Sequence, residues 1–391
     1  MTAERLIDLG TGAHAGNEHD ARIAALRARM AEHGLAAIAV ASPENIYYLT
    51  GLDHLGYFAF SLLLVPAHGE LAVVTREMER PTIRAQLPGC RHLTFGDGED
   101  PGEVTADALE RLVEPGATVA VEESTMFFPP AIHALLRGRL PGVRWTDGTG
   151  LLVDARAIKS PGELEHIRRA AGVSDAAMRA GIGAAGVGVP EREIAASVYH
   201  AMFSAGGQQP GFVPLIRPLW ILDQEHVSWG ERVLDEGTGL FMELSGCVRR
   251  YHAPMSRTIY IGRAAPDAEE AHAAGMAGLE AARSALHPGA LTGDVYSAWQ
   301  RAVAGSEANS WPQRHHCGYL VGIGFPPSWV GGGEVLGIRP GGEVEIAAGM
   351  TFHLMSWVTQ PVGHVISDTA LVTETGAELL TSVPRELTVV S

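Results

Sequence analysis

The most constraining feature of the sequence is a pair of apolar runs that contain polar residues. The run 240–242 leads into Glu243, and residues 251–261 are typical of a second strand that ends at Gly262. A carboxylate or an imidazole inside a buried sheet is unfavourable unless it is hydrogen-bonded or paired. We therefore expect Glu243 and His252 to have either structural partners or a chemical role.

The spacing within this hairpin resembles that of the creatinase, prolidase, aminopeptidase P and methionine aminopeptidase family, whose fold is called pita-bread. In the family hairpin, two aspartates hold a pair of divalent metals. Glu243 falls at the first of these positions and Pro254 at the second, while Arg257 and Thr258 keep their places. Proline has no side-chain donor atom for a metal.

The remaining metal-ligand positions of the family have also changed. The family histidine falls on Tyr319, the first glutamate on Met355 and the last glutamate on Ser367. Hard divalent cations require several anionic oxygens, and Glu243 is the one carboxylate left in this set. The resemblance therefore implies the family fold without its dinuclear peptidase chemistry. We predict no metal and no cofactor.

Length and composition indicate a protein of two domains. The chain has 391 residues, of which 46% are hydrophobic, and the mean hydropathy is +0.07. The formal net charge of −16 argues against a nucleic-acid or anionic-membrane partner. No apolar run approaches the length of a membrane span, and residues 1–8 do not resemble a signal peptide. We expect a soluble cytoplasmic protein.

The order of the predicted elements indicates an α/β (α+β) protein. We expect an arm over 1–20, a creatinase-like βα domain over 21–152 and a pita-bread catalytic domain over 153–391. Ser160 as N-cap, Pro161 and Glu163 predict the start of a helix that runs to about Gly181. Other predicted helices cover 21–33, 77–86, 130–139, 191–203, 267–286 and 291–304, and predicted strands cover 35–40, 61–65, 71–74 and 118–121.

Creatinase is the family member that hydrolyses a C–N bond without a metal, and it uses a histidine as proton shuttle. His226 stands at the matching place, seventeen residues before Glu243. One imidazole can accept a proton from water and return it to the departing nitrogen. The resemblance thus implies His226 as general base and acid, with Glu243 and His252 orienting substrate or water.

Two motifs are similar to those of the ectoine hydrolase group. These are a Glu-x-x-Gly-Cys-x-x-Arg-Tyr-His hairpin beginning at Glu243 and a His-x-Cys-Gly-Tyr loop beginning at His315. The sequence departs from that group at two places. Val365 is apolar where that group has a glutamate nearby, and the segment 75–80 does not resemble that group. The resemblance therefore implies hydrolysis of a non-peptide C–N bond in a small zwitterion and leaves the substrate open.

A zwitterionic substrate requires a cationic clamp for its carboxylate and an acceptor for its cationic nitrogen. Glu243 can accept, and Arg250, Arg257 and Arg314 are candidate clamps because guanidinium binds carboxylate bidentately; for Arg257 a structural role is the alternative. The predicted substrate-binding set is Arg250, Tyr251, Arg257, Arg314, His316, Tyr319, His353 and Trp357. Further aromatic residues that could wall the pocket are Trp220, Trp229, Trp311 and Trp329.

Several alternatives stay open from the sequence. A single-metal site could be rebuilt from histidines, namely His226, His252, His315, His316, His353 and His364. A lyase or a cyclase would use the same proton shuttle, and a binding module without catalysis is a further possibility. The resemblance also implies a homodimer, in which residues near Tyr57 and Phe58 reach the partner's site.

Overall fold

The computed structural model describes four ranges of the chain, residues 15–304, 314–333, 335–359 and 362–391. The chain forms two compact units. The amino-terminal unit ends at Arg156, four residues beyond the predicted domain boundary, and also includes the short segment 331–333. Residues 1–14, which make up most of the predicted arm, lie outside the described ranges.

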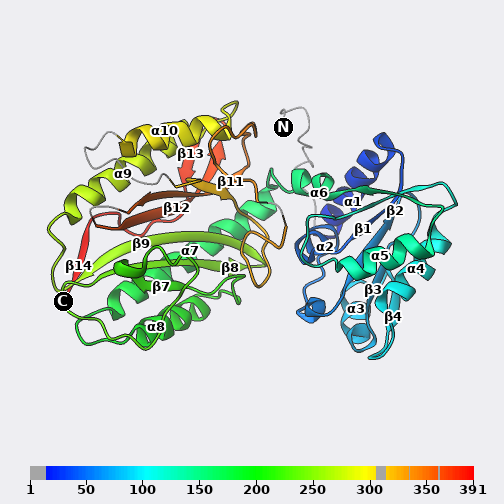
Figure 1. Ribbon diagram of the computed structural model, residues 1–391, viewed down its shortest axis with the longest axis horizontal. Helices are drawn as coiled ribbons and strands as arrows, with labels where there is room; N and C mark the ends of the chain where they lie inside the picture. Colours follow the sequence, from blue (N-terminus) through cyan, green and yellow to red (C-terminus); the bar gives the residue numbers. More distant parts are fainter. Residues whose placement is uncertain (1–14, 305–313, 334, 360–361) are drawn as a thin grey trace. The chain divides into compact units, whose positions relative to one another are not determined.

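The amino-terminal unit is built on one mixed sheet of six strands (Figure 1). The strands are β1 Leu35–Val40, β2 Leu62–Pro66, β3 Ala72–Arg76, β4 Arg91–Phe95, β5 Thr118–Val121 and β6 Arg144–Asp147. Their order is β4-β3-β2-β1-β5-β6, with antiparallel pairing on both sides of β2 and parallel pairing elsewhere. The sequence did not predict the edge strands β4 and β6. Strand β6 is mostly exposed, and β4 is mostly half-buried and has only two apolar residues, Leu93 and Phe95.

Helices pack against this sheet and complete its core. They are α1 Ala15–Glu32, α2 Pro43–Thr50, α3 Arg80–Gln86, α4 Pro101–Leu112, α5 Pro130–Arg139 and α6 Thr149–Ala155. Leu109 of α4 and Leu136 of α5 are fully buried in one cluster with strand residues such as Val119. Helix α1 begins six residues before the predicted start at Ala21, and the predicted helix over 77–86 is split by a 3-10 turn at Glu77–Glu79.

The carboxy-terminal unit contains a second, larger sheet of eight strands. Its strands are β7 Leu215–Pro218, β8 Gly239–Val248, β9 Tyr251–Ile261, β10 Gly318–Leu320, β11 Thr351–Val358, β12 His364–Thr373, β13 Gly376–Leu379 and β14 Thr388–Val390. The main order is β10-β11-β12-β9-β8-β7, with β13 on β12 and β14 on β9. The predicted hairpin is therefore the pair β8 and β9, which lies in the middle of the sheet and is buried along its whole length.

Two helix pairs cover one face of this sheet (Figure 1). They are α7 Pro161–Ala184 with α8 Glu191–Ser204, and α9 Ala268–Ala285 with α10 Thr292–Ala304. Helix α7 packs on β8 and β9, and α9 packs on β11 and β12. The predicted capping box begins α7: Glu163 N donates to Ser160 Oγ (3.2 Å) and Ser160 N donates to a Glu163 carboxylate oxygen (2.9 Å).

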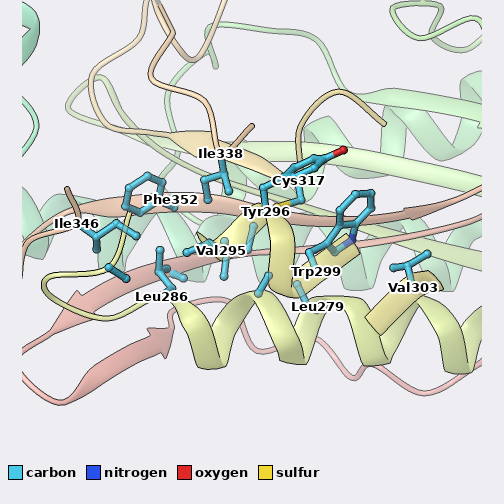
Figure 2. Close-up of a cluster of buried hydrophobic side chains, with 14 of the residues drawn as sticks. Leu279, Leu286, Val295, Tyr296, Trp299, Val303, Cys317, Ile338, Ile346 and Phe352 are labelled. Carbon is cyan, nitrogen blue, oxygen red and sulfur yellow. The ribbon is translucent and has the colours of Figure 1, made fainter. Parts of the chain in front are cut away.

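An apolar core joins the second helix pair to the sheet (Figure 2). Leu279 of α9, Val295 and Trp299 of α10 and Phe352 of β11 are buried together in it. Cys317 lies in the same core, where it acts as a small buried apolar residue.

The predicted fold class is confirmed. An α/β domain of the creatinase amino-terminal type precedes a pita-bread domain, in which the order of helix pair and antiparallel hairpin occurs twice on one curled sheet. Among the helices that the structure describes, none is long and apolar enough to cross a membrane.

Candidate active site

The face of the sheet opposite the helices carries the candidate active site. On β8, a Cβ atom at Gly246 would meet Ser174 N and the Cβ of Val173, both in α7, so the even-numbered positions face the helices and Glu243 faces away. On β11, Ser356 accepts from Trp299 of α10 (3.1 Å), so the odd-numbered positions also face away. Strand pairing therefore places Glu243 and the odd-numbered residues of β11 on one surface.

This surface forms the floor of a cavity of about 390 Å³. Glu243 from β8, Tyr319 from β10, and Met355 and Trp357 from β11 line it. The connecting segments complete the lining with Phe212, Glu225, His226, Arg314, His315, His316, Trp329 and Arg339, among others. All of these residues belong to the carboxy-terminal unit.

Glu243 is the buried acid of the cavity. Its side chain is only 6% exposed, and no group in the described ranges donates a hydrogen bond to its carboxylate within 3.5 Å. Burial raises the pKa of Glu243 to about 7, although the positive charges of Arg217 and Arg314 act in the opposite direction. Glu243 is thus close to half-protonated near neutral pH, which suits a group that exchanges a proton or receives a cation.

The imidazole of His353 lies beside Glu243 and is neutral. Its Nδ1 is 3.9 Å from a Glu243 oxygen. Burial, together with nearby His316, lowers the pKa of His353 to about 3. The contact is therefore one between a carboxyl group and a neutral ring rather than an ion pair.

A chain of hydrogen bonds fixes His353 and the neighbouring tyrosine. Trp329 Nε1 donates to Tyr319 Oη (3.0 Å), which lies 2.9 Å from His353 Nδ1. On the other side of the ring, Nε2 lies 2.7 Å from Ser367 Oγ, and Ser367 donates to Ser256 Oγ (2.7 Å). Because Ser367 uses its proton toward Ser256, His353 Nε2–H donates to Ser367, and Tyr319 Oη–H donates to Nδ1. The floor beside Glu243 is therefore a neutral, fully oriented network.

Two arginines supply positive charge around the cavity. Arg217 of β7 is fully buried, 4.7 Å above the ring of Phe241, and donates to the backbone oxygens of Leu222 and Val227 (3.2 and 3.1 Å). Arg314 stacks over Trp357 at 3.9 Å and pairs with Glu225 through both of its terminal nitrogens. Arg217 thus holds the segment that carries Glu225 and His226, and Arg314 reaches the cavity itself.

Aromatic rings and histidines form the walls. Phe212 meets Trp329 edge to face with ring centroids 5.5 Å apart, and also contacts the exposed His226 at 5.9 Å. His316 is half-buried, and burial together with Arg314 and His315 lowers its pKa to about 4. His226 is exposed and lines the cavity, so it lies where water and substrate can both reach it.

The structure brings a large part of the predicted site together and leaves four residues elsewhere. Within the cavity or its floor lie His226, Glu243, Arg314, His316, Tyr319, His353 and Trp357. Away from it lie His252, Arg250, Tyr251 and Arg257. Of the other predicted aromatic residues, Trp329 is a wall, Trp220 and Trp229 are not in the lining, and Trp311 lies outside the described residues.

His252 lies on the same strand face as Ser256 but four residues nearer the hairpin turn. At about 3.3 Å per residue this separation is about 13 Å. Its Nε2 accepts a hydrogen bond from Gly211 N (2.8 Å), and burial lowers its pKa to about 4. His252 therefore anchors the segment before β7 that carries Phe212, and it does not line the cavity in which it was predicted to orient substrate or water.

Arg257 lies on the opposite face of β9, where its guanidinium is fully used. Its five N–H donors bind the backbone oxygens of Ser256, Ser367, Val383 and Pro384 and one carboxylate oxygen of Asp368. None is left for a substrate carboxylate, so this geometry corresponds to the structural alternative for Arg257.

Tyr251 and Arg250 lie at the turn of the hairpin. The Tyr251 hydroxyl donates to Glu163 at the start of α7 (2.9 Å), and the guanidinium of Arg250 lies 4.5 Å over Phe325. These contacts hold the hairpin end in place, and neither residue lines the cavity.

The family's metal-ligand positions converge on this cavity, but their chemistry does not suit a metal. Glu243, Tyr319 and Met355 line it and Ser367 contacts His353, so four of the five positions are where a dinuclear site would lie. Only Glu243 offers an anionic oxygen, and a thioether, a phenol and a hydroxyl are poor ligands for hard divalent cations. Across the described ranges, no group of three His, Cys, Asp or Glu side chains is arranged to hold a metal ion.

Sequence reasoning missed Arg217 and Glu225, which shape the charge of the cavity. Arg217 interrupts a short apolar run at 215–218, and a buried charge of this kind was the available signal. Glu225 precedes His226 directly and carried no pattern of its own.

Comparison with known proteins agrees with this architecture. Residues 165–374 match the model of metallopeptidase family M24, and residues 22–158 match the creatinase/prolidase N-terminal domain. The fold and the cavity therefore define a two-domain protein of the creatinase and prolidase type.

Individual relatives make the relationship specific. The chain is 30% identical to ectoine hydrolase from Halomonas elongata over 391 aligned residues, which cover 95% of this chain and 96% of that protein. The crystal structure of dipeptidase PepE from Mycobacterium ulcerans is 25% identical, with a TM-score of 0.80 over 97% of this chain and 99% of that one. A prolidase from Thermococcus sibiricus shares the fold, with a TM-score of 0.85 at 19% identity over 97% of this chain and 100% of that one. The protein belongs to metallopeptidase family M24 and is a hydrolase of that family.

Proposed function

We propose that this protein hydrolyses a non-peptide C–N bond in a small compound that carries both a cationic nitrogen and a carboxylate, and that it does so without a metal. The observation that carries the proposal is Glu243, a buried carboxylate without a donor in the described ranges, set among aromatic walls. A carboxylate beside aromatic rings binds an organic cation through both charge and cation–π attraction. The cation of the substrate would supply the partner that Glu243 lacks.

The proposed reaction uses His226 as proton shuttle. His226 accepts a proton from water while the water oxygen bonds to the substrate carbon, and it then donates that proton to the nitrogen as the C–N bond breaks. Glu243 holds the cationic nitrogen and stabilises charge on it during the attack. The neutral network of Tyr319 and His353 fixes the position of Glu243 relative to the substrate.

Ectoine is the first substrate to test, because the relative with 30% identity is named an ectoine hydrolase. Ectoine is a cyclic amidinium carboxylate, so its two charges match Glu243 and the arginines of the cavity. A cavity of about 390 Å³ suits a ligand of this size.

Turnover of ectoine by the purified protein tests the proposal. Wild type should open the ring and incorporate ¹⁸O from labelled water, while His226→Ala should lose at least 10²-fold in kcat and still bind ectoine. His200→Ala, an exposed histidine on α8, serves as the matched control and should keep full activity.

Other outcomes identify the alternatives. Turnover without ¹⁸O in the product would indicate a lyase or a cyclase in place of a hydrolase. Binding of ectoine with no chemical change, in wild type and variants alike, would contradict catalysis and favour a binding module.

A further inference from the structure

The ion pair between Arg314 and Glu225 has the geometry of a bound ligand. Both terminal nitrogens of Arg314 contact the two oxygens of the Glu225 carboxylate, with Nη2 to Oε2 at 3.1 Å. A substrate carboxylate would bind a guanidinium in the same two-pronged way. Both residues line the cavity.

Arg314 is the fixed member of this pair. Its guanidinium lies 3.9 Å over the ring of Trp357, and its side chain is only 12% exposed. Its backbone oxygen also accepts a hydrogen bond from the hydroxyl of Tyr296 in α10 (2.7 Å). The positive group is therefore held against the cavity wall and partly shielded from water, where an anion binds most strongly.

Glu225 is the displaceable member. Its side chain is 40% exposed, and it lies on a segment whose two ends, at Leu222 and Val227, are held by Arg217. The carboxylate can leave Arg314 while these anchors remain in place. Because the Glu225 side chain is 40% exposed, its carboxylate can return to water when the anion of a ligand takes its place.

Two arginines of the cavity lining, Arg314 and Arg339, could bind the carboxylate of a zwitterionic substrate. Glu243 and the aromatic walls accept the cationic nitrogen, which leaves the substrate carboxylate in need of a guanidinium. Arg339 also lines the cavity but is exposed, so water screens its charge. Arg314 is the better placed of the two.

We infer that Arg314 is the subsite for the carboxylate of the substrate, and that Glu225 is an internal carboxylate which the substrate displaces from it. This inference rests on the proposed function, because it assigns the second charge of the same substrate. A ligand that carries a cation but no carboxylate cannot replace Glu225 and therefore gains nothing from Arg314. Selectivity for zwitterions follows from this competition.

Calorimetric binding of ectoine and of its carboxamide, which keeps the ring cation and lacks the negative charge, tests the exchange. Every protein compared, the reference included, carries His226→Ala, so that ectoine is bound and not hydrolysed. Glu225→Gln should bind ectoine at least threefold more tightly than the protein with the wild-type residue, since the competing carboxylate is gone. It should bind the carboxamide as tightly as the protein with the wild-type residue does. Arg314→Gln should lose the preference for ectoine over the carboxamide. Glu231→Gln, which removes the same charge at an exposed position outside the cavity lining, should match wild type.

The opposite pattern overturns the inference. Ectoine binding that is unchanged or weaker in Glu225→Gln, or undetectable in all variants, would show that Glu225 does not compete with a ligand. A preference that survives in Arg314→Gln and vanishes in Arg339→Gln would move the subsite to Arg339. Because the His226→Ala background binds ectoine without turnover, the expected binding pattern together with no hydrolysis by the wild-type protein would contradict the proposed reaction and leave the subsite in place.

Discussion

The carboxylate of Glu243 is buried, and no residue in the described ranges donates a hydrogen bond to it. Burial raises its pKa to about 7 from the ordinary value of 4.5. Between these two values the unfolded chain is ionised and the folded chain is not, so folding is opposed as the pH rises. A residue kept at such a cost is typical of a functional site.

Glu243→Gln should therefore stabilise the protein at pH 8 and abolish turnover. Each pKa unit corresponds to about 1.4 kcal/mol, so the gain in the free energy of unfolding is on the order of 3 kcal/mol above pH 7. The gain should shrink as the pH falls and be mostly lost at pH 5, because wild-type Glu243 is then protonated in the folded state. Urea unfolding of both proteins at pH 8 and pH 5 measures this.

Glu231→Gln provides the control, because Glu231 is exposed and its replacement should change stability little at either pH. A Glu243→Gln protein that is less stable than wild type at pH 8, or equally shifted at both pH values, would show that Glu243 has a partner in the folded state.

Sequence alone could place Glu243 and could have placed Arg257, but not His252. Alternation along β9 puts Arg257 on the face opposite Ser256, the partner of Glu243, so the predicted clamp could have been rejected by counting. His252 has the correct parity, and only its distance along the strand separates it from the cavity. The network of Tyr319, His353 and Ser367 could not be predicted, because it depends on the register of three different strands.

At the scale of elements, the site depends on how closely α7 lies against β8. A Cβ atom at Gly246 would lie 2.8 Å from Ser174 N and 2.8 Å from the Cβ of Val173, both in α7. Gly246 N also donates to Ser174 Oγ, which in turn donates to Ala253 O of β9 (2.6 Å). Close packing of α7 on β8 therefore requires glycine at position 246. This contact fixes the position of the strand that carries Glu243, three residues earlier in the chain.

Gly246→Ala should destabilise the protein by about 1–3 kcal/mol, because the added methyl group forces α7 away from the hairpin. Gly172→Ala is the matched control in the same helix. Gly172 is exposed, and a Cβ there meets nothing within 4 Å, so this change should stabilise α7 by roughly 0.5–1 kcal/mol. Urea unfolding of the two variants side by side measures both effects, and a neutral Gly246→Ala would mean that α7 can yield at this contact.

The elements that the sequence predicted best are those with a strong local signal. The capping residue Ser160, the buried hairpin β8 and β9 and the apolar strands β1 and β5 lie where they were expected. The strands β4 and β6 were missed because each is short, has one neighbour in the sheet and carries only one or two apolar residues. The boundaries of helices such as α1 differ by several residues, as fraying ends are weakly encoded.

At the scale of the whole molecule, the chain has the two-domain architecture of family M24, and the positions that the resemblance assigns to the family's metal ligands mostly hold other side chains. Glu243 is retained as an acid, while Pro254, Tyr319, Met355 and Ser367 replace the expected ligands. The space next to Glu243 is instead occupied by the neutral hydrogen-bonded network of His353. The homodimer, in which Tyr57 and Phe58 would reach the partner's site, remains a prediction.

Metal content and metal dependence, measured on one preparation, test the central claim most directly. Elemental mass spectrometry of the purified protein would be combined with ectoine turnover and melting temperature before and after treatment with a chelator. We predict metal far below one equivalent, with turnover and melting temperature unchanged by the chelator. A stoichiometric metal whose removal abolishes turnover and lowers the melting temperature would contradict the account.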